Sequence, residues 1–275
     1  MHLHLGAHKT ATTHFQNVLM DNNDKYPDGY QYIPMEDFRA NVTPFIGSRI
    51  DQCKPYLNEI QRSSPDVLIV SEENIAGEAK DIFNYHYLYS RLEARLGNLS
   101  EAMDKFDDVE IWFSIRSMDE FLPSMYCEYL KYWKFKPFKK VFCGDYEQSW
   151  VPVVKAITKC FPHAKINIVQ YENYTTTLPI IIDQIFGNNS GWNYQLDTRY
   201  RQSFSHIAIE SISKIYFILP LVFTSMVLAE MSKYAYRHQS DHKFSPFTEQ
   251  EKRLLRSIFA KDVKAISGMD NVILY

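Results

Sequence analysis

The residues best suited to chemistry gather near the start of the chain, in the stretch HLHLGAHKTATTHFQ at 2–16. Residues 2–5 predict a short buried strand, residues 6–9 a tight turn, and the residues from 10 onward a helix. The first N–H groups of a helix have no intrahelical partner and lie at the positive end of its dipole, so they attract an anion. The stretch therefore predicts a site for a phosphate or a sulfonate group, to which side chains add further donors: Lys9, Thr10, Thr12 and Thr13.

The spacing of this loop differs from that of the ordinary nucleotide-binding loop, G-x-x-x-x-G-K-[ST]. Here two residues separate Gly6 from Lys9-Thr10, and Ala-Thr-Thr follows directly. This order resembles the 5′-phosphosulfate loop of the sulfotransferase family, whose donor is 3′-phosphoadenosine 5′-phosphosulfate and whose usual sequence there is K-[ST]-G-T-T. Ala11 replaces the glycine, and because alanine disfavours a positive φ, we expect Ala11 to be helical. The resemblance implies donor-binding residues throughout the loop: Gly6, Ala7, His8, Lys9, Thr10, Ala11, Thr12 and Thr13.

A second group of candidate residues follows the apolar run at 67–70. Such a run predicts a strand buried on both faces, and ligands of open α/β sheets lie beyond the carboxyl ends of the strands. The polar residues after the run are Ser71, Glu72 and Glu73. Because successive side chains of a strand point opposite ways, one glutamate is expected to point toward the loop. The family resemblance extends to Ser-x-Glu here and favours Glu73 as general base. A helix cap or a solvated strand end is the competing interpretation.

A third group follows the predicted strand at 109–115. Arg116 ends this strand, and Ser124 lies eight positions later in a predicted helix. In the sulfotransferases an Arg and a Ser at this spacing hold the 3′-phosphate of the donor, so the resemblance implies that role for Arg116 and Ser124. Arginine suits it because its planar fork donates two hydrogen bonds to one phosphate. The family also closes over the donor with a late basic loop, which Arg199 or Arg201 could supply, and its Tyr-Glu turn matches Glu172, expected to brace a loop.

Strands alternate with helices along the chain, which predicts a three-layer α/β domain: a parallel sheet of the P-loop nucleotide-binding type with helices on both faces. We expect one domain over residues 1–275. Residues 21–50 are rich in Asn, Asp, Pro and Gly and predict an irregular excursion. Residues 126–145 interleave lysines with aromatic residues. Both excursions are expected on the acceptor side, although plain surface loops or a solvated lysine fringe would explain them equally well.

Composition limits the other functional classes. The net charge of −3 gives no general affinity for nucleic acid or anionic membranes. The four cysteines are scattered, as expected for reduced thiols in a cytoplasmic protein, and a strand starting at residue 2 leaves no room for a signal peptide. The apolar run at 215–229 is shorter than the roughly 20 residues of a membrane span and predicts a buried or interfacial helix pair. His2 and His4 lack a neighbouring carboxylate cluster, so no metal is expected.

Together the resemblances imply transfer of a sulfuryl group from 3′-phosphoadenosine 5′-phosphosulfate to an acceptor hydroxyl, expected to belong to a saccharide or a lipid-linked glycan. Lys9 would neutralise charge on the leaving oxygen. The base would be Glu73, with His8, His14 and Glu72 as alternatives. Two other functions stay open. One is a phosphotransferase using ATP, which shares the fold but needs a G-K-[ST] loop that is absent here. The other is a catalytically silent nucleotide-binding protein.

Overall fold

A computed structural model provides the structure of the chain. It describes residues 1–63, 65–83, 87–104, 106, 108–142, 146–188, 190–195, 203–216, 221–237 and 242–275, with the backbone alone at 221–223. The predicted Arg199 and Arg201 lie outside these described residues.

The centre of the fold is a six-stranded sheet whose pairings are all parallel. The strand order is β2-β3-β1-β4-β5-β6. The chain therefore first adds β2 and β3 on one side of β1 and then adds β4, β5 and β6 on the other side. Ligands of such sheets bind where the strand order reverses, beyond the carboxyl ends of the strands. The strands are β1 (His2–His4), β2 (Tyr30–Ile33), β3 (Val67–Ser71), β4 (Glu110–Ile115), β5 (Lys165–Gln170) and β6 (Val272–Leu274).

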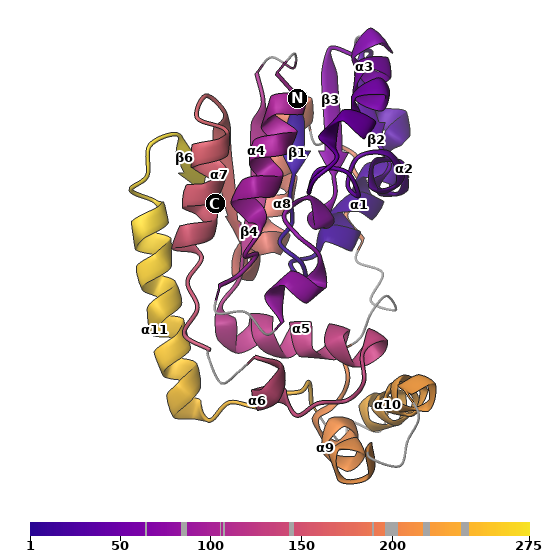
Figure 1. Cartoon of the computed structure of the whole chain (residues 1–275), viewed down its shortest axis with the longest axis vertical. Helices are drawn as coiled ribbons and strands as arrows, with labels where there is room; N and C mark the ends of the chain where they lie inside the picture. Colours follow the sequence, from indigo (N-terminus) through magenta and orange to yellow (C-terminus); the bar gives the residue numbers. More distant parts are fainter. Residues whose placement is uncertain are drawn as a thin grey trace.

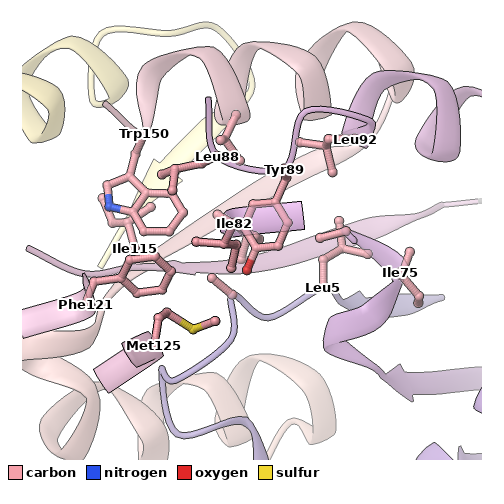
Figure 2. Packing of buried hydrophobic residues seen from close by; sticks show 14 of the residues in the cluster. Leu5, Ile75, Ile82, Leu88, Tyr89, Leu92, Ile115, Phe121, Met125 and Trp150 are labelled. Atoms are coloured by element: carbon pink, nitrogen blue, oxygen red, sulfur yellow. The ribbon is translucent and has the colours of Figure 1, made fainter. Parts of the chain in front are cut away.

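Helices cover both faces of the sheet, which confirms the predicted three-layer architecture (Figure 1). Ile69, Trp112 and Val169 point to one face, where they pack against α1 and α8. Their strand neighbours point to the other face and pack in a larger cluster, part of which Figure 2 shows around Leu5 and Trp150. The helices are α1 (Thr12–Asp21), α2 (Met35–Asn41), α3 (Lys54–Ser63), α4 (Leu92–Ala102), α5 (Met118–Tyr132), α6 (Phe138–Val141), α7 (Val151–Cys160), α8 (Tyr174–Phe186), α9 (His206–Ile215), α10 (Leu221–Arg237) and α11 (Glu249–Ile266).

The prediction of an irregular excursion at 21–50 is wrong, because this segment contains β2 and α2. Strand β2 is only four residues long and lies between Gly29 and Pro34. Four residues are too few to show the alternation of apolar and polar side chains that predicts a strand. Strand β6 is shorter still and was not predicted. The other excursion, at 126–145, begins inside α5 and also contains α6, while 143–145 lie outside the described residues.

The apolar run at 215–229 starts at the last residue of α9 and includes the first half of α10, while 217–220 lie outside the described residues. Helices α9 and α10 pack together. In the part of the chain that the structure describes, no helix combines the length and apolarity that crossing a bilayer requires. Thr248 and Glu251 form a capping box at the start of α11. These elements frame one end of the sheet, where α5 lies across it and α9 and α10 lie beyond α5 (Figure 1).

Candidate active site

The loop after β1 continues the pairing of β1 with β4 beyond the strand itself. The backbone N–H of Leu5 donates to Trp112 O at 2.9 Å, and Ser114 N–H donates to Gly6 O at 2.6 Å. Gly6 has φ of +100°, and a Cβ there would lie 3.0 Å from the Cβ of Glu73. Glycine is therefore required both by the backbone conformation and by the close approach of Glu73. The same residue starts the loop and admits the candidate base beside it.

The expectation that Ala11 is helical is wrong. Its φ of 66° and ψ of 21° are left-handed, and it is the N-cap of α1. Lys9, with φ of 60°, is left-handed as well. Two left-handed residues turn the chain sharply between β1 and α1, which a helical Ala11 could not do. The conformation is the one that favours glycine, the residue that the sulfotransferase loop has at this position. Ala11 adopts it at a cost in strain.

No side chain caps the N-terminus of α1. Its first-turn amides, at Thr12, Thr13 and His14, belong to residues that line a cleft of about 1190 Å³. The cleft contains most of the site residues predicted from sequence: His8, Lys9, Ala11, Thr12, Thr13, Glu73, Arg116 and Ser124. Three predicted loop residues do not line it, namely Gly6, Ala7 and Thr10. Thr10 instead stabilises the loop internally, since its buried hydroxyl donates a hydrogen bond to Ala7 O at 2.7 Å.

Lys9 extends into the cleft, where its Nζ lies 3.3 Å from Glu128 Oε2 of α5. Glu128 also pairs with Lys131 at 2.9 Å. Burial raises the pKa of Glu128, but Lys9 and Lys131 outweigh it and bring the pKa to about 2. Glu128 is thus an anion that holds the Lys9 ammonium in the cleft. Sequence analysis did not find it, because a glutamate 119 positions away on an amphipathic helix carries no local signal.

The two glutamates after β3 have separate roles. Glu72 is fully buried and accepts two hydrogen bonds from Arg39, at 2.7 and 2.8 Å, and one from the backbone N–H of Asn74 at 2.7 Å. This fork-to-fork pair fixes the turn and leaves Glu72 outside the cleft. Glu73 lines the cleft, and its Oε1 lies 3.7 Å from Arg39. Burial raises the pKa of Glu73, but the nearby basic groups of His8 and Arg39 lower it overall, so Glu73 is ionised at neutral pH.

His8 is committed to a buried network. Its backbone N–H donates to Tyr89 Oη at 3.0 Å, its Nδ1 lies 2.9 Å from the same oxygen, and its Nε2 lies 3.0 Å from the side-chain amide of Asn74. Burial lowers the pKa of His8, against the opposing effect of the nearby Glu73 carboxylate. Because both ring nitrogens are engaged, His8 suits positioning of the loop better than proton transfer. His14, whose Nδ1 lies 2.9 Å from Tyr174 Oη, also has its pKa lowered by burial.

Arg116 connects the loop to α5. Its NH1 donates to Lys9 O at 2.9 Å, its NH2 donates to Glu120 at 2.7 Å, and its guanidinium lies 4.1 Å above the Tyr171 ring. The buried Nε of Arg116 has no hydrogen-bond partner among the described residues. Ser124 lines the same cleft. The predicted bracing role of Glu172 is confirmed, since it accepts the backbone N–H of Ser117 at 2.9 Å.

Three basic residues of the C-terminal quarter also line the cleft near Arg116, and sequence analysis missed them: Lys243, Lys252 and Arg256. Arg256 donates to the buried Asp119 at 2.8 Å, which ties α11 to the start of α5. In the described ranges, no three His, Cys, Asp or Glu side chains are grouped so as to hold a metal ion.

Comparisons with known proteins add one structural likeness. No protein-family model matches the sequence, and no curated protein matches it either. Among solved structures, the chain is similar to a sulfotransferase from Alicyclobacillus acidocaldarius, with 10% sequence identity and a TM-score of 0.43. The similarity covers 86% of this chain and 98% of that one.

Proposed function

We propose that this chain is a sulfotransferase that moves a sulfuryl group from 3′-phosphoadenosine 5′-phosphosulfate to a hydroxyl of a saccharide. One observation carries the proposal. The uncapped N-terminus of α1 and Lys9 line the same cleft as Arg116, Ser124 and an ionised carboxylate, Glu73. That combination offers two places for anionic groups and one proton acceptor, which is what a doubly phosphorylated donor and a hydroxyl acceptor require.

The residues present fit such a donor. The first-turn amides of α1 and the Lys9 ammonium suit the phosphosulfate, because both direct positive charge into the cleft. Arg116, with an unpartnered buried Nε, and the nearby Ser124 suit the 3′-phosphate. Glu120, which is half exposed and pairs with Arg116 in this structure, can be displaced toward solvent when a phosphate takes its place. The donor supplies the activated sulfuryl group, and the remaining chemistry belongs to the protein.

Transfer forms a bond between sulfur and the acceptor oxygen and breaks the bond between sulfur and the phosphate oxygen. Glu73 accepts the proton of the acceptor hydroxyl, a role that needs an ionised carboxylate in the cleft. Lys9 stabilises the negative charge that grows on the phosphate oxygen. In this structure Lys9 is balanced by Glu128, and exchanging that partner for a phosphate keeps the ammonium paired throughout.

The proposal is tested by the transfer of radiolabelled sulfate from the donor to a panel of glycans and phenols. We expect Glu73→Gln to lower kcat by a factor on the order of 10² to 10⁴ with unchanged nucleotide affinity, and Lys9→Ala to abolish turnover. Glu93→Gln, at an exposed residue paired with Lys159 outside the cleft, is the matched control. Full activity of the Glu73→Gln variant would remove Glu73 from the chemistry, and ATP-dependent phosphorylation of the panel would favour a kinase.

A further inference from the structure

The basic and aromatic stretch after position 126 separates into two parts in the structure. Tyr132 and Trp133, at the C-terminal end of α5, line the cleft. The lysines that follow do not: Lys134, Lys136, Lys139 and Lys140. Tyr132 is 62% exposed and Trp133 is partly buried, so a bound molecule can reach both. The stretch therefore presents aromatic surface to the cleft and keeps most of its positive charge elsewhere.

Trp133 is held rigidly by its neighbours. Its ring stacks on that of Tyr129, with ring centroids 5.6 Å apart and planes at 15°. It also makes an edge-to-face contact with the Phe83 ring, with centroids 5.5 Å apart. The backbone after it is fixed as well, because Tyr129 Oη donates to Lys134 O at 2.8 Å and Tyr126 Oη donates to Lys136 O at 2.7 Å. A preorganised aromatic wall loses little conformational freedom when a ligand packs on it. Such walls suit the flat, apolar face of a sugar ring.

Several polar residues that line the same cleft as Trp133 supply hydrogen-bond acceptors and donors suited to hydroxyl groups. Glu73 and Asn74 come from the turn after β3, and Glu78 and Lys80 come from the following segment around η4 (Ala79–Ile82). Glu73 lies among them, so a ring seated against Trp133 would lie in the same cleft as the candidate base.

The charges around this region are balanced. Lys80 pairs with Glu78 at 2.7 Å, Arg39 pairs with Glu72 at 2.7 Å, and both Lys9 and Lys131 pair with Glu128. Glu73 adds a further negative charge. Among these residues the positive and negative charges are equal in number, so the region offers no net positive charge to attract a sulfated or uronic-acid glycan.

We propose that the part of the cleft between Trp133 and the Glu73–Lys80 segment is an acceptor subsite for an uncharged sugar ring. Trp133 packs against the apolar face of the ring, Tyr132 extends that surface, and the acidic side chains accept hydrogen bonds from its hydroxyls. The inference rests on the proposed function, since it names the acceptor class of that reaction.

The test uses fluorine NMR of protein labelled with 5-fluorotryptophan, titrated with methyl β-glycosides of neutral sugars and with the methyl glycoside of glucuronic acid. The chain contains four tryptophans, and the variant Trp133→Phe assigns the signal of Trp133. We expect neutral glycosides to shift the Trp133 signal and the glucuronide to shift it at least tenfold more weakly at low salt. No donor is needed, so the outcome is independent of whether the nucleotide binds.

Activity gives the second readout. We expect Trp133→Ala to raise the acceptor KM at least tenfold while affinity for the nucleotide product stays unchanged, and Trp133→Phe to retain most of the activity. Tyr234→Ala, at a 68% exposed aromatic residue outside the cleft, is the control. The subsite is overturned if no neutral glycoside shifts the Trp133 signal, or if the glucuronide binds more tightly. If the protein without substitutions does not bind the nucleotide product, the proposed function is overturned instead.

Discussion

At the scale of single residues, the loop depends on backbone conformations that its composition does not favour. Ala11 takes a left-handed conformation at the N-cap of α1, and Gly6 admits Glu73 at close range. Sequence analysis recognised both positions but misjudged Ala11. The general preference of alanine for helical backbone was outweighed here by the need to turn the chain between a fixed strand end and a fixed helix start.

This strain leads to a stability prediction. Replacing Ala11 with glycine removes the left-handed penalty, on the order of 1 kcal/mol, which exceeds the entropy that glycine adds to the unfolded chain. We expect Ala11→Gly to raise the thermal midpoint by about 1–4 °C. Ala11→Val, which adds a β-branched side chain at the same φ, should lower it. Calorimetric unfolding measures both. A lower midpoint for Ala11→Gly would mean that the residue is not left-handed in solution.

At the scale of elements, the loop is held from outside by the segment between η4 and α4. Tyr89 is almost fully buried, has φ of 53°, and provides the one hydroxyl that accepts the N–H of His8 and also contacts its ring. Figure 2 shows Tyr89 within the core cluster beside Leu5. This role of Tyr89 could not be predicted from the sequence, because its contact with His8 spans 81 positions.

We expect Tyr89→Phe to weaken binding of 3′-phosphoadenosine 5′-phosphate roughly tenfold, because it leaves the buried His8 N–H without a partner, at a cost of about 1–3 kcal/mol. Tyr126→Phe is the matched control, since it removes another buried hydroxyl, bonded to Lys136 O, away from the loop. Both variants should lose some thermal stability, but only the first should lose nucleotide affinity. Equal nucleotide affinity of the two variants would show that Tyr89 does not position the loop.

At the scale of the whole molecule, the parallel sheet and its helices were predictable because long apolar runs mark β3, β4 and β5 and periodic helices separate them. The position of the loop, Glu73 and Arg116 at one edge of the sheet was predictable because each follows a strand whose carboxyl end opens there. Ser124 lies within α5, and only the family resemblance pointed to it. The rest of the site was not. Arg39, Glu128 and Arg256 reach it from α2, α5 and α11, and such pairings form only once distant helices pack.

We propose that the loop around Lys9 and the pair Arg116 and Ser124 bind one nucleotide together. The most direct test is titration calorimetry of 3′-phosphoadenosine 5′-phosphate, with AMP and ATP as controls and Arg116→Ala as the variant. A charge-assisted hydrogen bond contributes about 1.5–3 kcal/mol, so we expect at least roughly tenfold tighter binding than AMP or ATP, lost in Arg116→Ala. Equal affinity for AMP, or a preference for ATP, would contradict the account.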